Sequence, residues 1–256
     1  MNRHPACYPV TLLALAGLLS AQTPLENNGK PMRVLYECLA ADTQAAGLAC
    51  SEDDPCPVYL ELSNVEPVGG KIFVTGNIHT AMATLYSILL ASENGGNTWT
   101  EPHPRLRSSG LDQVQFADNL TGWISGANLQ GAPRDPFLMI TTDGGKTWHE
   151  RPIFEEGRVA AIERFWFDTS SHGTMLIDAR LDNGKREWVE THNGGESWAA
   201  QETADPAHAA KERPVTAPGW RVRTDAATHS YVIEKSENNR WRKAASFMVD
   251  IASCKE

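Results

Sequence analysis

The chain has 256 residues, 41% of them hydrophobic, and a formal net charge of −9. This length and composition favour one sizeable globular domain. An excess of acidic side chains repels nucleic acid and anionic membranes, so we expect neither as a partner.

The first 21 residues are typical of a secretory signal peptide. Arg3 and His4 precede an apolar run from Thr11 to Leu19, and Ser20-Ala21 supplies the small residues of a cleavage site. The run is shorter than the ~20 residues that a helix needs to cross a bilayer, and no later stretch is more suitable. We therefore expect a periplasmic or extracellular protein without stable membrane insertion.

Four cysteines follow the expected cleavage point: Cys38, Cys50, Cys56 and Cys254. An even number in an exported chain indicates two disulfides, and four cysteines allow three pairings. We prefer Cys50–Cys56, which closes a short acidic loop, and Cys38–Cys254, which ties the two ends of the mature chain together. A zinc site at the cysteines is disfavoured because no CxxC or nearby His pair supplies the ligand spacing.

Three similar eight-residue segments recur along the chain: SENGGNTW at 92–99, TTDGGKTW at 141–148 and THNGGESW at 191–198. Their final tryptophans are 49 and 50 positions apart, and a degenerate copy, EKSENNRW, ends 43 positions later at Trp241. A period of this length is typical of β-propeller blades, in which each repeat is a small antiparallel sheet.

The stretches between these segments predict short strands. In the second repeat, residues 111–118 alternate apolar with polar residues, 119–122 predict a turn, and 137–141 lead into the repeated segment. Comparable strands are expected in the other repeats, at 71–75, 85–90 and 162–168 and after a connection at 199–218. No convincing helix is found in the mature chain.

The fold class predicted from these strands is all-β. We expect a small β-propeller of four four-stranded antiparallel blades, or of five if residues 32–39 contribute strands. The predicted organisation is a signal peptide at 1–21, an N-terminal segment with the cysteine loop at 22–57, and the propeller at 58–256, closed by a strand at 32–39.

The repeated segment has the chemistry of a turn. Its paired glycines tolerate positive φ, so the chain can reverse sharply. The Asp or Asn side chain and the flanking hydroxyls can accept hydrogen bonds from the amides of the turn, and the Trp can bury a large aromatic surface. The residues expected to have these structural roles are Ser92, Asn94, Gly96, Trp99, Thr141, Asp143, Gly145, Trp148, Thr191, Asn193, Gly195, Trp198 and Trp241.

The three segments resemble the Asp-box, or BNR repeat, of sialidases, sortilin-type receptors and assembly proteins, where it lies on outer hairpins away from the active face. Residues 111–148 are similar to blades of the photosystem II stability and assembly factor family, and residues 58–99 and 159–198 are so more loosely. That resemblance implies an exported propeller that binds partner proteins and is not an enzyme. The fourth repeat departs from it, because Asn238 and Asn239 replace the glycines.

A search for catalytic signatures favours a protein without enzymatic activity. The mature chain lacks the Arg-Ile-Pro or Arg-Leu-Pro segment that a sialidase would require, and it contains no GxSxG, HExxH or phosphate-binding loop. The eight histidines are scattered, and His79, His172 and His229 are expected at the surface near turns. We predict no cofactor and no metal.

Two tryptophans outside the repeated segments are candidates for binding. Trp188 and Trp220 lie beside charged residues, so if they are exposed they could stack on a sugar or anchor a partner protein. The leading hypothesis is an exported non-catalytic propeller that binds a protein partner and assists assembly of an envelope complex. The alternative is a carbohydrate-binding or glycoside-hydrolase propeller.

Overall fold

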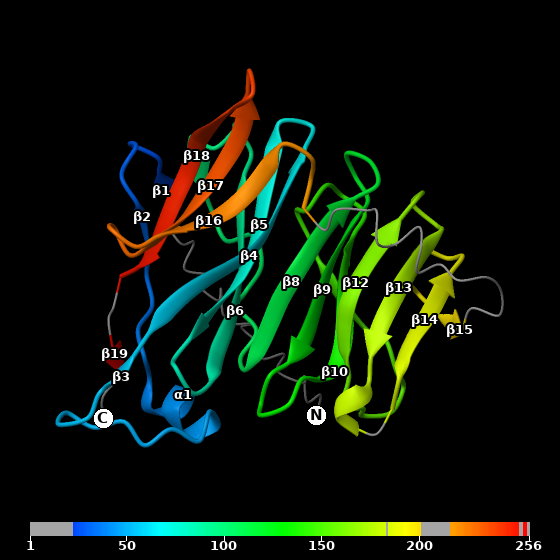
Figure 1. Cartoon of the computed structure of the whole chain (residues 1–256), viewed down its shortest axis with the longest axis horizontal. Helices are drawn as coiled ribbons and strands as arrows, with labels where there is room; N and C mark the ends of the chain where they lie inside the picture. The colour runs from blue at the N-terminus through cyan, green and yellow to red at the C-terminus, as the bar shows by residue number, and fades with distance from the viewer. Residues whose placement is uncertain (1–22, 183, 201–215, 251–252, 255–256) are drawn as a thin grey trace, which may run out of the picture.

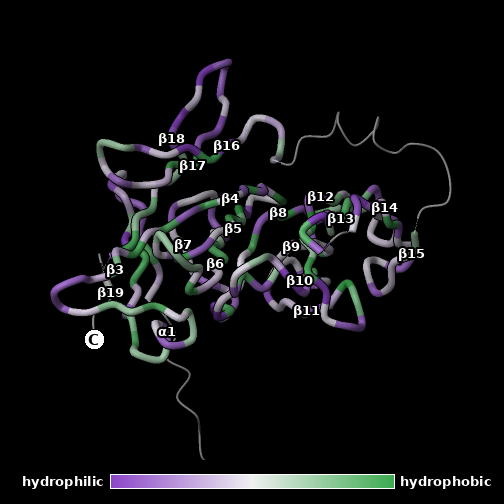
Figure 2. The backbone as a smooth tube through the Cα atoms, turned by 60° about the horizontal axis from the view of Figure 1, so that its bottom comes forward, coloured by the Kyte–Doolittle hydropathy of each residue, from purple (hydrophilic) through white to green (hydrophobic). Residues whose placement is uncertain are grey.

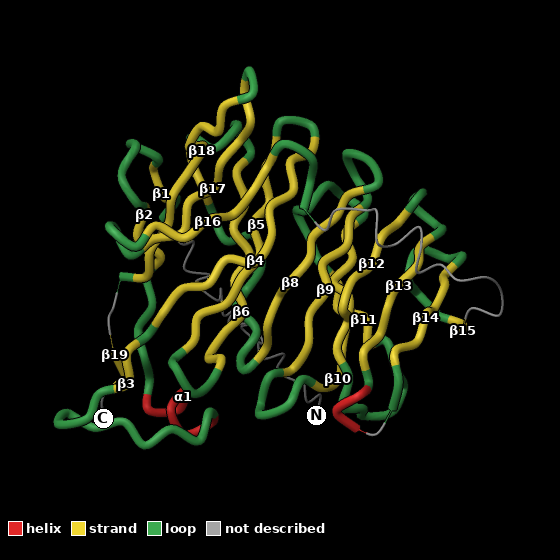
Figure 3. Tube along the Cα trace, viewed as in Figure 1, coloured by secondary structure: helices red, strands yellow, loops and turns green. Residues whose placement is uncertain are grey.

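The computed structural model describes residues 23–182, 184–200, 216–250 and 253–254. The expected signal peptide and most of the expected connection at 199–218 lie outside the described residues. The described chain is nearly all β, and its two short helices lie at the same end of the molecule (Figure 3). The predicted all-β class is therefore confirmed.

Three sheets follow one another along the chain. The first contains β4 (Tyr59–Val68), β5 (Lys71–His79) and β6 (Thr84–Ser92). The second contains β8 (Ser109–Phe116), β9 (Gly122–Asn128), β10 (Arg134–Thr141) and β11 (His149–Pro152). The third contains β12 (Ala161–Phe167), β13 (Gly173–Asp178), β14 (Arg186–Thr191) and β15 (Ala199–Ala200). Neighbouring strands in all three sheets are antiparallel, as the strand patterns predict.

The first sheet differs from the other two at its outer edge. There β7 (Thr98–Trp99) pairs with β1 (Leu25–Glu26), which comes from the N-terminal segment. Its link to β6 is a single bridge between Ala91 and Thr100. The N-terminal segment is thus part of the folded domain and not a separate unit.

A fourth sheet combines both ends of the described chain. It contains β16 (Trp220–Asp225), β17 (Ser230–Glu237), β18 (Arg240–Val249) and β2 (Met32–Val34), and β2 pairs with β18 in parallel. The strand expected at 32–39 is therefore shorter, and it extends the fourth sheet instead of beginning a fifth.

The four sheets lie side by side as the blades of a small β-propeller, in the order fourth, first, second, third (Figure 1). The third and fourth sheets are at opposite ends of this row, so closure of the ring stays a prediction. In each of the first three sheets the first strand, β4, β8 or β12, packs against the strands of the preceding sheet in this row.

The fourth sheet is not a further copy of the other three. Trp220, at the start of β16, shares a surface cavity with Val68 at the end of β4. Asp225, at the end of β16, shares another cavity with Tyr59 at the start of β4. The two strands therefore run in opposite directions, which the spacing of the tryptophans could not show.

The apolar core lies between successive sheets. One cluster joins the fourth sheet, the first sheet and the N-terminal segment, and it includes Trp99 and Phe247. A second cluster, around Phe73, lies between the first and second sheets, and a third, around Phe165, lies between the second and third. Each blade thus buries its faces only against neighbours, as expected of a propeller repeat.

Glutamine side chains fasten the second sheet to the third. The side-chain amide of Gln113 donates to the carbonyl of Phe165 at 2.7 Å and accepts from its N–H at 3.1 Å. Gln115 makes the same pair of bonds to Phe167, at 3.0 and 2.8 Å. These bonds satisfy backbone groups that no adjacent strand pairs, and such groups are costly to bury alone.

At the corresponding positions between the first and second sheets, each side chain accepts one hydrogen bond from a backbone N–H through a single oxygen. Asn64 accepts from the N–H of Val114 at 3.4 Å, and Glu66 accepts from the N–H of Phe116 at 3.3 Å. Burial raises the pKa of Glu66 to about 7. Glu66 is therefore an acid at a position where the next repeat has the neutral Gln115.

Helix α1 (Ala40–Ala45) was not predicted from the sequence. It has six residues, and the side chain of Asp42 accepts from the N–H of Leu39 at 3.2 Å, which closes its first turn. A helix this short is marginal alone, so tertiary contacts must hold it. Among the described residues, no helix is long and apolar enough to cross a membrane.

Both preferred disulfides are present. Cys38 is bonded to Cys254 and Cys50 to Cys56. The strands that flank them, β3 (Cys56–Pro57) and β19 (Ser253–Cys254), pair with each other. Two disulfides are typical of proteins from oxidising compartments.

Candidate functional site

The three repeated segments form turns at one end of the sheets, which we call the turn end. In each turn, the hydroxyl of the first residue accepts a hydrogen bond from the N–H of the second glycine. The distances are 2.8 Å for Ser92, 2.9 Å for Thr141 and 3.0 Å for Thr191. Both glycines of every turn have positive φ, which explains why glycine is required there.

The Asp or Asn at the third position organises the rest of each turn. Its Oδ1 accepts the N–H of the residue four positions later, at 2.9 Å for Asn94 and 3.0 Å for Asp143 and Asn193. The hydroxyl of that same later residue donates a hydrogen bond where the third position is Asp and accepts one where it is Asn. Thr147 donates to Asp143 at 2.6 Å, whereas Thr98 accepts from Asn94 at 3.0 Å. Polar groups of the turn are therefore satisfied locally.

The tryptophans of these turns connect each sheet to the core. Trp99 is fully buried and meets Phe247 of the fourth sheet edge-on, with ring centroids 5.0 Å apart. Trp148 contacts Phe73 of the first sheet at 6.1 Å. In the third turn the link to the preceding sheet is made by Trp123, which donates to the carbonyl of Gly194 at 2.8 Å. The turns thus join successive sheets.

The fourth copy of the segment is built differently. Asn238 and Asn239 adopt φ of 50° and 59° and form a two-residue hairpin between β17 and β18. Asn tolerates this left-handed conformation, so the hairpin forms without glycine. The tip is hydrophilic and projects from the molecule (Figure 2). Trp241 is 43% exposed and has the guanidinium of Arg221 over its ring at 4.2 Å. By contrast, Trp99 and Trp148 are buried and Trp198 is half-buried.

The structure does not bring Trp188 and Trp220 together. Trp188 is half-buried on β14 and packs edge-on against Trp166 at 5.5 Å. Trp220 is half-buried against the core of the fourth and first sheets, with the ammonium of Lys235 5.8 Å from the centre of its ring. Their proposed role in binding stays a prediction.

The opposite end of the sheets, which we call the loop end, is formed by helix α1 and the loops 80–83 and 129–133. Asp42 on α1 is 3% exposed and accepts from the hydroxyl of Tyr86 at 2.6 Å and from Arg107 at 2.9 Å. Tyr36 also donates to it, at 3.1 Å. These contacts dock the N-terminal segment onto the first sheet and the start of the second.

The Asp42 cluster contains residue types that occur in glycosidase sites, but its groups are engaged with one another. Burial, followed by the Asp42 carboxylate, raises the pKa of Tyr36 well above its usual range. The pKa of Tyr86 is also raised, first by burial and then by its hydrogen bond to Asp42. Both phenols are therefore neutral at ordinary pH, and the cluster fits a structural role.

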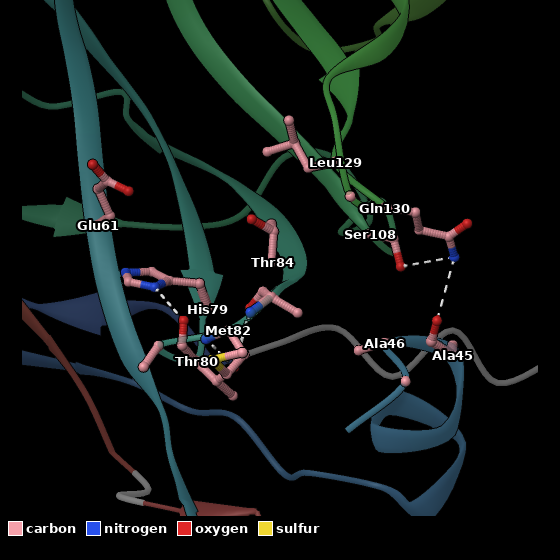
Figure 4. A pocket seen from close by; sticks show the side chains of 14 residues that line it. Ala45, Ala46, Glu61, His79, Thr80, Met82, Thr84, Ser108, Leu129 and Gln130 are labelled. Carbon is pink, nitrogen blue, oxygen red and sulfur yellow. Dashed lines mark hydrogen bonds between the residues drawn. The ribbon is translucent and has the colours of Figure 1, made fainter. Parts of the chain in front are cut away.

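A cavity of about 680 Å³ lies at the loop end (Figure 4). Its walls come from the end of α1, loop 80–83, and the loop that follows β9. Gln130 links two of these walls by donating to the carbonyl of Ala45 and the hydroxyl of Ser108, both at 3.4 Å. The charged or aromatic side chains in the lining are Glu61 and His79.

A second cavity, of about 570 Å³, lies between the first and fourth sheets. Its wall is mostly apolar: Val58, Tyr59, Leu60, Tyr231, Met248 and Val249. His79 lines both cavities, and its ring lies 5.7 Å from that of Tyr59. The two cavities therefore adjoin at His79, and we refer to them together as the loop-end site.

Exposed apolar side chains border the loop-end site. Met82, in loop 80–83, is 84% exposed, and Tyr59 is 47% exposed. Leu35 and Leu39 are also exposed, in the segment that leads into α1, but neither lines the two cavities. Several exposed large apolar groups at one end of a molecule are typical of an interaction surface.

The charges of the loop-end site are acidic. Glu61 lines the first cavity and Asp225 the second, and neither described lining includes Lys or Arg. Asp112 has an exposed side chain, but the surrounding protein atoms remove part of its hydration and so raise the pKa of its carboxyl group. The negative charge of the nearby Glu61 raises this pKa further. Burial and the same Glu61 raise the pKa of Tyr231. The site thus favours a cationic group.

Sequence patterns did not identify the loop-end site. Its residues come from seven separate stretches of the chain, and none belongs to a repeated segment. The sequence predicts two of its residues, His79 and His229, only as surface histidines near turns. The resemblance implies a functional face away from the repeated turns, and that location stays a prediction.

No protein-family model matches the chain, and no curated protein matches it. Similar solved structures include YCF48 bound to D1 peptide, with 16% identity, a TM-score of 0.36, and coverage of 74% of this chain and 55% of that one. They also include a GH74 xyloglucanase from Xanthomonas campestris, with 14% identity, a TM-score of 0.40, and coverage of 70% and 27%.

A third similar structure is a PL25 ulvan lyase, with 11% identity, a TM-score of 0.39, and coverage of 77% of this chain and 52% of that one. This chain thus spans between 27% and 55% of the lengths of these three proteins. Identities and TM-scores at this level do not transfer a function, so the proposal below depends on the geometry of the site.

Proposed function

We propose that this chain is an exported, non-catalytic β-propeller that binds an extended segment of a partner protein at the loop-end site. The observation that carries the proposal is the pair of adjoining cavities, one apolar and both bordered by acid, beside the highly exposed Met82. The repeated turns are Asp-boxes with a structural role. Two disulfides support export to the periplasm or the cell exterior, where the chain would assist assembly of an envelope complex.

The lining indicates the chemistry of the segment that binds. The apolar wall around Leu60 and Met248 suits a buried aliphatic or aromatic side chain. Glu61 and Asp225 suit a Lys or Arg beside it, and an acidic surface also speeds the approach of a basic partner. Met82 can adapt its shape to different partner surfaces because its side chain is unbranched and flexible.

A carbohydrate ligand is the second candidate, and Tyr59 is the observation that favours it. This ring is half-exposed at the mouth of the second cavity, and an aromatic face can stack on a sugar. The polar residues of this lining are His79, Thr224, Asp225, His229 and Ser230. Its surface is nevertheless mostly apolar, which suits an apolar side chain better than a sugar. The protein segment is therefore preferred.

The test is a selection of displayed random peptides against the disulfide-bonded protein, with a glycan array and a panel of chromogenic glycosides in parallel. We expect enrichment of peptides that combine Lys or Arg with an apolar residue, and loss of that enrichment in Met82→Glu. Asp143→Asn, at the turn end, is the matched control and should retain it. Enrichment that persists in Met82→Glu, or glycan binding or hydrolysis without peptide binding, would refute the proposal.

A further inference from the structure

Two histidines and a carboxylate meet at the turn end of the third sheet. His172 precedes β13, Glu190 is on β14, and His192 follows Thr191 in the third repeated turn. The Nδ1 atoms of the two histidines are 3.3 Å apart, and the Nε2 atom of each is 3.5 Å from Oε1 of Glu190. One ligand atom from each residue can be chosen so that all three lie within 4.8 Å of one another.

The strand register explains why these three side chains converge. Gly173 is paired with Thr191, so His172 and His192 lie opposite each other just beyond that pair. Glu190 is two residues before His192, and residues two apart on a strand project to the same face. The three side chains therefore converge because the strands pair residues about 20 positions apart. The sequence alone does not show this pairing.

The same positions in the other two sheets contain different chemistry. In the first sheet the pair of Ile72 with Ser92 brings Lys71 opposite Glu93, and these form an ion pair at 3.1 Å. In the second sheet the pair of Gly122 with Thr141 places Thr121 and Thr142 there. The backbone of each sheet thus brings two side chains together just beyond this strand pair. In the third sheet these side chains are the metal-ligating His172 and His192.

The spacing suits a tetrahedral divalent ion. Zinc binds imidazole nitrogen at 2.0–2.1 Å, so two nitrogens on one tetrahedral ion lie about 3.3 Å apart. The two Nδ1 atoms have this separation, whereas Glu190 lies beside the Nε2 atoms. One ion takes one nitrogen from each ring, and a rotation of these side chains is enough to bring three ligand atoms that already lie within 4.8 Å onto it. Imidazole together with a carboxylate is a usual ligand set for zinc, with three protein ligands and one open position. His192 is 77% exposed and the side chains of His172 and Glu190 are 36% and 25% exposed, so an ion can enter from solvent.

We propose that His172, Glu190 and His192 bind one zinc ion, with its fourth position open to water or to a donor from another molecule. The site lies on the sheet at one end of the row and at the turn end, so it is separate from the loop-end site. Its existence does not depend on the function proposed above.

Calorimetric titration of the metal-depleted, disulfide-bonded protein with zinc chloride tests the proposal. We expect one equivalent to bind, and Co²⁺ bound in its place to show the visible absorption of a tetrahedral site. His192→Ala should lower the affinity for zinc at least about tenfold, since a ligand is lost. His149→Ala, an exposed histidine on β11, is the control and should bind as the wild type does.

His192 is exposed, so its replacement leaves the fold intact, and Glu190→Gln provides a second, conservative variant that should also weaken binding. Zinc should raise the midpoint of thermal unfolding of the wild type and of His149→Ala, and not that of His192→Ala. The proposal is overturned if the wild type shows no saturable binding, or if His192→Ala and Glu190→Gln bind zinc as tightly as His149→Ala does.

Discussion

The two ends of the sheets are built on different principles. At the turn end, the residues of each repeated segment satisfy one another: Thr141 donates to Asp143 and accepts from the N–H of Gly145, and Asp143 accepts from the N–H of Thr147. At the loop end, the cavities are assembled from distant segments, and Met82 and Tyr59 remain exposed. The difference teaches that the most patterned part of this sequence forms self-satisfied turns, whereas the unpatterned part forms the exposed cavities at which we propose binding.

The largest expected effect on stability is a difference between two tryptophans of the turn end, Trp148 and Trp241. Trp148→Ala removes a buried ring that packs between Phe73 and Phe116, so it should lower the free energy of unfolding by about 3–5 kcal/mol. Trp241→Ala, at the exposed fourth copy, should cost less than about 1 kcal/mol. Urea denaturation of the two variants measures both values, and equal losses would show that the fourth copy is as structural as the second.

The Asp143 side chain should contribute a smaller amount. Asp143→Ala leaves the N–H groups of Lys146 and Thr147 without their acceptor, at a cost of about 1–2 kcal/mol. Asp143→Asn should cost less than about 0.5 kcal/mol, because Asn94 and Asn193 perform the same role in the other turns. A large loss in Asp143→Asn would contradict the equivalence of the three turns.

The pH dependence of the free energy of unfolding should differ between the wild type and Asp143→Asn, because Asp143 titrates and the Asn of the other two turns does not. Hydrogen bonds, first from the side chain of Thr147 and then from its N–H, lower the pKa of Asp143. A lowered pKa in the folded state means that stabilisation is present above the unfolded pKa of about 4 and is lost as the pH falls below it. Urea denaturation between pH 7 and pH 3 should therefore show a steeper loss for the wild type than for Asp143→Asn.

The smallest effect is expected where the first sheet meets the second. The pKa of Glu66 is raised to about 7 in the folded protein, so stability is lost as the pH rises from the unfolded value of about 4.5 through 7. Glu66→Gln reproduces the neutral Gln115 of the next interface and should stabilise the protein by about 1 kcal/mol at pH 8, with little effect at pH 5. Destabilisation at pH 8 would indicate that Glu66 has a cationic partner.

The sequence predicted what depends on neighbouring residues. The three turns are foreseeable because Gly-Gly, the flanking hydroxyls and the Asp or Asn interact within a few positions. Both disulfides were also the preferred pairings. The fourth repeat departs from the pattern because Asn238 and Asn239 replace the glycines, yet it still forms a hairpin, since Asn tolerates the same backbone conformation.

What the sequence could not predict depends on contacts between distant segments. Helix α1 is held by Asp42, whose partners Tyr86 and Arg107 lie 44 and 65 positions away. The reversed direction of β16 follows from packing against β4, and the spacing of the tryptophans contains no information about it. The cavity at His79 and the meeting of His172 with His192 also require the register and arrangement of strands.

The most direct test of the account compares one change at each end of the sheets. A peptide selected on the wild type should lose at least about tenfold in affinity for Tyr59→Ala, because removing a central aromatic contact costs on the order of 1.4 kcal/mol or more. Its affinity for folded Asp143→Ala should be unchanged, although that variant is less stable. The opposite result, with binding lost in Asp143→Ala and retained in Tyr59→Ala, would place the binding surface at the turn end and contradict the account.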